Sequence, residues 1–304
     1  MNNDVIYREA CLEDREGILG IGKMYNGMDY MKKRIDKILT DKDILCYVAE
    51  IGGQIVGFNS MVFGQDYAVK CSLRVHVNHR KRGIGTVLSE HLISASKEMR
   101  KDAMAKILIV SLDNSFYRDQ MSDELGAFAK YTCLHKMKYT SLCTTASSVR
   151  NFARDTPFPS EVKQPTADEF FSFMRQHTSL FGDDFIVYWD PRTFDSLQEL
   201  YDNLEIFIYK SSIAFYKIFH IETATRVDID MFGVSASDMR VFVTAVLHRL
   251  NEGIFENKVE VLLFNRLDVH LSDDDVLQEK LNWTPGLVSS MTNRHERWLL
   301  RLNE

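Results

Sequence analysis

The sequence predicts an α/β (α+β) protein in which helices flank a mixed central sheet. Three consecutive features predict this fold. Residues 73–77 alternate in polarity like a strand, a basic turn with two glycines follows at residues 80–85, and apolar residues then recur at helical spacing. A strand, a glycine turn and a helix start form an anion-binding corner, because the first N–H groups of a helix have no partner inside it.

The corner favours a polyphosphate ligand. Gly83 and Gly85 allow backbone conformations closed to other residues and let a ligand approach closely, while Arg80, Lys81 and Arg82 supply positive charge. The pattern matches neither the Gly-x-x-x-x-Gly-Lys-Ser/Thr loop nor the dinucleotide fingerprint Gly-x-Gly-x-x-Gly. These two classes of nucleotide site are therefore excluded.

The spacing Arg80-x-x-Gly83-x-Gly85 resembles the acetyl-coenzyme A signature Gln/Arg-x-x-Gly-x-Gly/Ala of the GNAT superfamily of N-acetyltransferases. That superfamily places its signature after a strand like residues 73–77 and at the start of a helix like residues 86–100. The alternative is a basic surface turn between a strand and a helix. The surrounding pattern favours the acetyl-coenzyme A site.

Length and composition limit the class of protein. A chain of 304 residues predicts two domains, and 45% hydrophobic with 26% charged residues is typical of a soluble globular protein. The net charge of −6 argues against nucleic acid as a main partner. The five scattered cysteines contain no Cys-x-x-Cys pair, so we expect a reducing compartment and no metal. With neither a leader pattern nor an apolar run of about 20 residues, we expect a cytoplasmic protein without a membrane partner.

The first half of the chain has an element order that resembles the GNAT fold. We expect strands at residues 5–10, 44–51, 55–63, 73–77, 105–112 and 139–145. We expect helices at residues 12–25, 31–39, 86–100 and 128–136. Gly52-Gly53 predicts a tight hairpin between two of the strands. The resemblance implies that residues 1–146 form the catalytic domain with the acetyl-coenzyme A site.

The second half partly repeats this order. Residues 147–165 carry three of the five prolines and are predicted to be a linker. Over residues 166–304 we expect a hairpin at 204–220, strands at 226–234, 259–264 and 297–302, and helices at 237–251 and 273–281. Where the first half has its basic corner, residues 233–238 offer one glycine and no cation. We expect a second, degenerate GNAT-like domain, and an unrelated α+β domain is the alternative.

The resemblance also implies which residues hold acetyl-coenzyme A, the one cofactor expected. In GNAT enzymes the strand before the signature separates from its neighbour and pairs its backbone with the pantetheine arm. A backbone N–H near the bend of that strand stabilises the oxyanion of the thioester. The residues carried over by position are Val75, Val77, Arg80, Arg82, Gly83, Ile84, Gly85, Thr86 and Asn114.

The usual proton-transfer groups of the family do not carry over. The carboxylate base falls near Val69 and the tyrosine acid falls on Leu134, and neither side chain transfers a proton. Three residues are candidate catalytic substitutes. Tyr131 lies on the same face of the predicted helix as Leu134, His135 directly follows Leu134, and Asp113 follows a predicted strand. The alternatives are packing for Tyr131 and turn capping for Asp113. Water could also carry the proton.

The acceptor is indicated by residues 25–30, Tyr-Asn-Gly-Met-Asp-Tyr. With residues 57–60 and the segment around Arg74, they resemble the vertebrate histidine N-acetyltransferases and their relatives. The resemblance implies a free amino acid as acceptor, L-histidine at its α-amine. Asp29 then pairs with the ammonium, Tyr25 or Tyr30 stacks on the imidazole, and Arg74 binds the carboxylate. For Asp29 a helix N-cap is the alternative.

Two other functions remain open from the sequence. The chain could acetylate another small amine or a protein N-terminus, because the motif that indicates the acceptor is short. It could also be a non-catalytic acyl-coenzyme A-binding module, because the usual acid and base are missing. The sequence does not indicate an oligomeric state.

Overall fold

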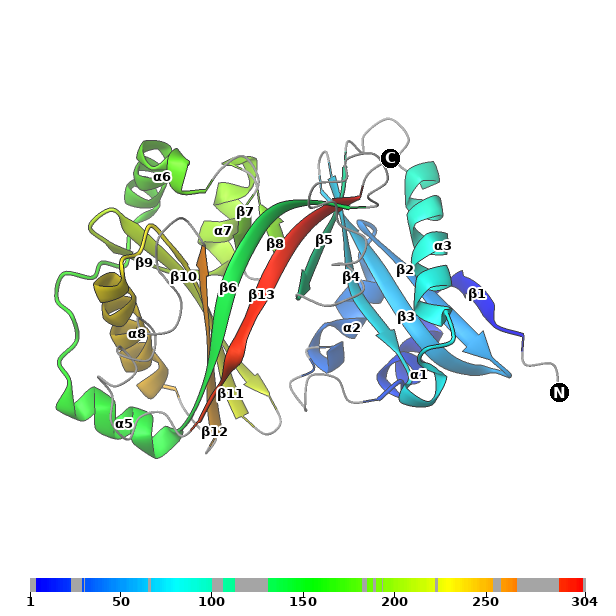
Figure 1. The fold of residues 1–304 in the computed structure, drawn as a ribbon, viewed down its shortest axis with the longest axis horizontal. Helices are drawn as coiled ribbons and strands as arrows, with labels where there is room; N and C mark the ends of the chain where they lie inside the picture. The colour runs from blue at the N-terminus through cyan, green and yellow to red at the C-terminus, as the bar shows by residue number, and fades with distance from the viewer. Residues whose placement is uncertain are drawn as a thin grey trace. The chain divides into compact units, whose positions relative to one another are not determined.

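The computed structural model describes residues 4–22, 29, 31–64, 67–99, 106–112, 131–181, 185–187, 190–192, 194–221, 224–253, 258–266 and 290–302. The chain divides into two compact units, one centred on residues 1–110 and one on residues 133–299. Figure 1 shows the helices and strands of both units.

The first unit contains five strands in the spatial order β1-β2-β3-β4-β5. Their bounds are β1 Ile6–Glu9, β2 Ile44–Ile51, β3 Gln54–Phe63, β4 Tyr67–Val75 and β5 Lys106–Leu112. The pairs β1–β2, β2–β3 and β3–β4 are antiparallel, and the pair β4–β5 is parallel. The predicted hairpin is confirmed, since Gly52 and Gly53 both have positive φ, 57° and 82°, as a type I′ turn requires.

Helices cover both faces of this sheet (Figure 1). They are the 3₁₀ turn η1 Leu12–Asp14, α1 Arg15–Leu19, α2 Met31–Thr40 and α3 Ile84–Met99. Val48 of β2 packs with Ile18 and Ile35 of α1 and α2, whereas the next residue, Ala49, packs with Leu88 of α3. Adjacent strand residues face opposite sides, so α1 and α2 lie on one face and α3 on the other.

The second unit contains the strand order β13-β6-β12-β11-β10-β9. The bounds are β6 Tyr131–Thr145, β9 Glu205–Tyr209, β10 Ser212–Ile221, β11 Ala224–Phe232, β12 Lys258–Arg266 and β13 Ser290–Leu302, with the small pair β7 Phe185–Val187 and β8 Asp190–Arg192. The helices are α5 Ala146–Asp155, α6 Ala167–Gln176, α7 Leu197–Asn203 and α8 Ala236–Asn251, with 3₁₀ turns η4 Thr178–Leu180 and η5 Phe194–Ser196. Strands β11 and β12 are parallel and α8 connects them, as α3 connects β4 and β5.

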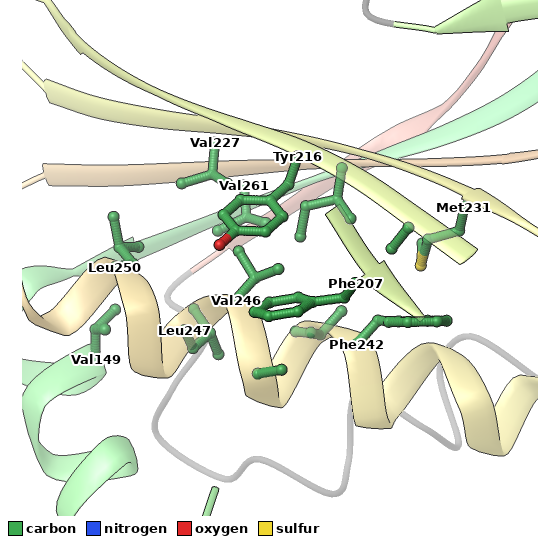
Figure 2. Packing of buried hydrophobic residues seen from close by; sticks show 14 of the residues in the cluster. Val149, Phe207, Tyr216, Val227, Met231, Phe242, Val246, Leu247, Leu250 and Val261 are labelled. Atoms are coloured by element: carbon green, nitrogen blue, oxygen red, sulfur yellow. The ribbon is translucent and has the colours of Figure 1, made fainter. Parts of the chain in front are cut away.

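The core of the second unit lies between this sheet and α8 (Figure 2). Phe242, Val246 and Leu250 follow one another at helical spacing and are buried against the sheet. Tyr216 and Val227 face them from β10 and β11. The predicted strands and helix of this half are therefore confirmed where the structure describes them, and the predicted helix at 273–281 lies outside the described residues.

The predicted helix at residues 128–136 is wrong for the described part of that segment. Residues 131–136 begin β6, whose continuation pairs with β12 from Met137 to Thr145. The strand prevails because this long-range ladder satisfies the backbone hydrogen bonds that a helix would satisfy locally. The helical face predicted to include positions 131 and 134 therefore does not form.

The predicted linker at residues 147–165 begins with a helix instead. Helix α5 covers Ala146–Asp155, and the side chain of Thr145 caps it by accepting a hydrogen bond from the Ser148 amide at 3.1 Å. Val149 is fully buried in the core of the second unit. The sequence signal was weak because only one face of this short helix is apolar.

Among the described residues, no helix is both long and apolar enough to cross a bilayer.

An ion-pair network joins the start of the first unit to its sheet. Arg8 on β1 makes two hydrogen bonds of 2.7 Å to the carboxylate of Asp14 and two, of 3.0 and 3.2 Å, to Glu50 on β2. Asp14 is 8% exposed. The hydrogen bonds from Arg8 lower the pKa of Asp14 from 3.8 to about 2.

Asp14 is expected to contribute to stability against acid. Because its pKa is lower in the folded chain, the contribution is complete above pH 3.8 and is lost as the pH falls toward 2. Asp14→Asn should reduce the free energy of unfolding at pH 7 by on the order of 1 kcal/mol, a small value because Arg8 is partly exposed. Urea unfolding at several pH values measures this. Asp155→Asn, at the exposed pair with Arg154, is the control, and an equal effect of the two substitutions would contradict the assignment.

Candidate functional site

Strand β4 contains one extra residue relative to β3. Ser60 of β3 pairs with Cys71 of β4, and Phe58 pairs with Arg74. Between these two pairs the chain advances by two residues in β3 and by three residues in β4. Ser72 lies in the longer step and has a φ of 62°, in the left-handed region that few non-glycine residues adopt. The irregularity is a β-bulge.

The bulge changes which face the end of β4 uses. Lys70 lies on the α3 face, since its Nζ is 3.5 Å from Oγ of Ser89 on α3. Leu73 lies on the same face, since a Cβ placed at Gly85 of α3 would be 3.8 Å from Leu73 Cδ1. Side chains three positions apart in a regular strand face opposite sides. The extra residue at Ser72 therefore directs Leu73 toward α3 and its neighbour Arg74 toward α1 and α2.

Strand β4 also continues beyond its pairing with β5. The parallel ladder joins Tyr67–Lys70 to Lys106–Ile109, whereas β4 runs on to Val75. Val75 faces Gly57 of β3, and the next amide, His76 N, donates to Val56 O at 2.8 Å. In an antiparallel ladder this pattern marks Val75 as a non-hydrogen-bonded position. Its own N–H and C=O therefore point away from β3, along the edge where β4 has left β5.

The basic turn follows this edge and is exposed. A 3₁₀ turn, η3 Val77–His79, leads into it, so Val77 lies outside the strand that was predicted to contain it. Lys81 and Gly83 have left-handed φ values of 59° and 77°. A Cβ placed at Gly83 would meet no atom within 4 Å. Glycine is favoured there by its backbone conformation, and the space beside it is open.

The first turn of α3 directs its amides into this exposed region. Gly83 O accepts hydrogen bonds from Thr86 N at 3.0 Å and from Val87 N at 3.1 Å. The amides of Ile84 and Gly85 precede these donors, at the helix positions that have no intrahelical acceptor. The side chain of Ile84 is buried in the core with Leu88, so only its backbone is available to a ligand.

The cations of the turn already have specific neighbours. Arg80 Nε donates to Val75 O at 3.0 Å, and Arg82 Nη1 lies 3.1 Å from His79 Nδ1. Lys81 is exposed. The corner therefore combines helix amides with three positive side chains, the chemistry expected of a phosphate site.

Gly85 differs from the prediction. It is helical, and a Cβ there would make ordinary contacts of 3.5 Å with Val75 and 3.8 Å with Leu73. It does not use a conformation closed to other residues. The first turn of α3 therefore packs closely on the side chains of Val75 and Leu73 at the end of β4.

Sequence analysis missed a buried polar group beneath this turn. Lys70 is 5% exposed and Asn59 is fully buried. Both contact Ser89 Oγ, which donates to Gly85 O at 2.8 Å. A lysine within an apolar strand was the available signal, because a buried ammonium needs hydrogen-bond acceptors.

Arg74 and Asp29 bind each other on the opposite face of β4. Arg74 Nη1 and Nη2 lie 2.7 and 3.2 Å from the two carboxylate oxygens of Asp29. Asp29 Oδ1 also accepts from the amide of Met31, the first residue of α2, in an Asx-type bond just before the helix. Arg74 is 3% exposed, and its Nε is buried with no hydrogen-bond partner among the described residues.

Tyr131 lies at the start of β6 and is 2% exposed. Burial, and then the negative charge of Glu90 on α3, raise the pKa of its phenol. The phenol therefore stays protonated at neutral pH. For His135 the structure describes only the backbone, within β6, and Asp113, Asn114, Tyr25 and Tyr30 lie outside the described residues.

The corresponding corner of the second unit is closed. Strands β11 and β12 pair continuously from Thr225 to Met231, so no edge opens there. The start of α8 is satisfied by its own residues, since Asp238 Oδ2 accepts from Ser235 N at 3.0 Å and Ser235 Oγ accepts from Asp238 N at 3.2 Å. A carboxylate already occupies the helix end that would attract an anion.

Comparison with known proteins agrees with this geometry. Residues 42–120 match the model of the acetyltransferase (GNAT) domain. The matched segment contains the bulged strand, the basic turn and α3. Solved structures at low identity share the fold over nearly the whole chain.

Three of these structures are similar in both halves. A candidate acetyltransferase from Thermoplasma acidophilum is 11% identical, with a TM-score of 0.56, and the match covers 98% of this chain and 100% of the other. One from Pyrococcus horikoshii is 13% identical, with a TM-score of 0.53, covering 100% and 90%. A tandem GNAT protein from the clavulanic acid biosynthesis pathway is 14% identical, with a TM-score of 0.53, covering 99% and 98%.

At these identities the structures establish the fold, a mixed α+β GNAT sheet followed by a second sheet region. The family match covers residues 42–120 of the 304-residue chain. This segment therefore contains an acetyltransferase (GNAT) domain, which implies an acetyl-coenzyme A-dependent N-acetyltransferase activity.

Proposed function

We propose that this enzyme acetylates the α-amine of a free amino acid and that L-histidine is the acceptor. The Arg74–Asp29 pair is the observation that carries the acceptor class. The Nη atoms of Arg74 bind Asp29, and the buried Nε–H of Arg74 has no acceptor among the described residues. An unmatched buried donor is costly, and a ligand carboxylate oxygen removes that cost.

The structure modifies the predicted division of roles between these two residues. Arg74 and Asp29 were predicted to bind the carboxylate and the ammonium separately, but they bind each other. The proposal is that Asp29 fixes the guanidinium while the Nε–H receives the acceptor carboxylate. Asp29, which is 20% exposed, keeps part of its carboxylate accessible to an ammonium.

The choice of histidine rests on the resemblance of residues 25–30 to histidine N-acetyltransferases. Tyr25 or Tyr30 is proposed to stack on the imidazole. Aromatic rings favour such offset stacking, and an imidazole is small enough to share a site with an α-carboxylate and an α-ammonium.

The exposed corner is the proposed site of the coenzyme A diphosphate. The proposed contacts are the amides of Gly83, Ile84, Gly85 and Thr86, the side chains of Arg80 and Arg82, and Asn114. The free edge at Val75, with Val77 beyond it, is proposed to bind the arm between phosphate and thioester. The thioester supplies the acetyl group, and the acceptor nitrogen must be deprotonated before it attacks.

The proposed proton donor to the departing thiolate is Tyr131. Its raised pKa keeps the phenol protonated, and a buried phenol donates without competition from bulk water. His135 and Asp113 stay the proposed candidates for taking the proton from the acceptor amine, directly or through water.

A panel of acceptors tests the function. Purified chain is incubated with acetyl-coenzyme A and free amino acids, small amines or N-terminal peptides, and thiol release is measured. We expect the highest kcat/KM with L-histidine. Turnover on peptides alone would replace the proposal by protein N-terminal acetylation, and the absence of turnover on every acceptor would leave a binding module.

Arg74→Met is expected to lower kcat/KM for L-histidine by about tenfold to a hundredfold, the value of a hydrogen bond to a charged group. Histamine lacks the carboxylate, so we expect its kcat/KM to be lower than that of L-histidine and to be unchanged by Arg74→Met. The ratio of the two values is the measurement, because it does not depend on the fraction of folded enzyme. An unchanged ratio would remove Arg74 from the acceptor site.

Gly83→Val is expected to raise the KM for acetyl-coenzyme A by about tenfold, since a side chain would enter the open space at the helix start and displace a charge-assisted hydrogen bond. Gly53→Val is the matched control. Gly53 has a φ of 82° and equally open surroundings, but it lies in the β2–β3 turn. Steady-state kinetics measure the KM for acetyl-coenzyme A of both variants, and equal values for Gly83→Val and Gly53→Val would place the cofactor elsewhere.

Tyr131→Phe is expected to lower kcat by about 10²-fold while the KM for acetyl-coenzyme A stays the same, because only proton donation is lost. Tyr7→Phe is the control, since burial also raises the pKa of Tyr7 but its ring stacks on His91. A kcat equal to that of the unmodified enzyme would show that Tyr131 only packs.

A further inference from the structure

Arg80 connects the basic turn to the free edge of β4. Its Nε donates to Val75 O at 3.0 Å. That carbonyl points away from β3, because Val75 is a non-hydrogen-bonded position opposite Gly57. Arg80 therefore occupies an acceptor that would otherwise be open to an extended ligand lying along this edge.

The same side chain belongs to the proposed phosphate site. Arg80 precedes Gly83 by three residues and is exposed, so its guanidinium can reorient without disturbing the core. A guanidinium binds a phosphate through hydrogen bonds in which both partners are charged, and two such bonds can form in parallel, whereas at Val75 O only the donor is charged. A phosphate at the start of α3 would thus compete with Val75 O for Arg80.

We propose that Arg80 exchanges partners when the ligand binds and thereby makes the site selective for phosphate-bearing acyl carriers. This inference rests on the proposed function of the corner. In this structure Arg80 Nε donates to Val75 O. A carrier with both a diphosphate and amide N–H groups draws Arg80 to the phosphate, and an amide of the carrier takes the vacated carbonyl.

A carrier without phosphate gains nothing from this exchange. It must displace Arg80 from Val75 O and leaves the guanidinium without a new anionic partner. Its affinity is reduced by the cost of that displacement, whereas a phosphate-bearing carrier is repaid by the stronger bond. Arg80 is therefore a specificity-determining residue whose effect has opposite signs for the two kinds of ligand.

The test compares two ligands that share the same arm. Coenzyme A carries the phosphates and pantetheine does not. Their dissociation constants are measured at equilibrium with the full chain, for the unmodified protein, Arg80→Met and Arg82→Met. Arg82 is the matched control, because it is an exposed cation of the same turn whose Nη1 lies 3.1 Å from His79 rather than at the strand edge.

Arg80→Met should weaken coenzyme A binding by about tenfold and strengthen pantetheine binding by about threefold, since the hydrogen bond from Arg80 to Val75 O no longer has to be broken. Arg82→Met should weaken coenzyme A binding and leave pantetheine unchanged. The inference is overturned if Arg80→Met weakens both ligands, or if it leaves pantetheine binding at the unmodified value.

Inorganic diphosphate gives a second measurement. Saturating diphosphate should draw Arg80 from Val75 O and so increase the affinity of the unmodified protein for pantetheine by about threefold. The increase should persist in Arg82→Met and disappear in Arg80→Met. An equal increase in all three proteins, or none in the unmodified protein, overturns the exchange.

Failure of this inference and failure of the proposed site give different results. If the unmodified chain does not bind coenzyme A, the proposed cofactor site is wrong and the exchange falls with it. If the unmodified chain binds coenzyme A but Arg80→Met does not change the affinities for coenzyme A and pantetheine in opposite directions, the proposed site is retained and only the exchange is wrong.

Discussion

The single extra residue at Ser72 in β4 is the constraint on which the site depends. Side chains alternate along a strand, so one inserted residue reverses the faces of all that follow. It places Leu73 and Val75 beside the start of α3 and directs Arg74 to the face of α1 and α2. The pairing of β4 with β5 has ended by this point, so no strand among the described residues pairs with this edge at Val75. One local distortion thus directs Leu73 and Arg74 to opposite faces of the same strand.

The two units show why a shared topology does not imply a shared site. Each contains two parallel strands joined by a long helix. In the first unit the helix start is exposed, follows three cations and has a glycine with a left-handed conformation. In the second unit Asp238 satisfies the helix start, and the adjacent strands stay paired. A carboxylate at that position competes with any phosphate, so the second unit has kept the framework without the anion chemistry.

Buried charge is concentrated around the bulged strand of the first unit. Arg74 and Lys70 are both almost fully buried, on opposite faces of β4 and within four residues of each other. Each forms hydrogen bonds, Arg74 to Asp29 and Lys70 to Ser89. Burying such groups costs free energy even when they are paired. Both charges therefore lie close to the point where β4 leaves β5.

Sequence alone determined the features that depend on near neighbours. The paired glycines predicted the β2–β3 hairpin, and the spacing from Val87 predicted α3. The alternation at residues 73–77 predicted the end of β4, which spans Tyr67–Val75. The signature at Arg80 predicted the family of the domain. These follow from local backbone preferences and short-range periodicity. Only the tertiary structure decided that Ser72 is a bulge, that Arg74 binds Asp29 from 45 positions away, and that Tyr131 begins a strand. Each of these depends on which distant segment supplies the hydrogen-bond partner, and local sequence does not specify that choice.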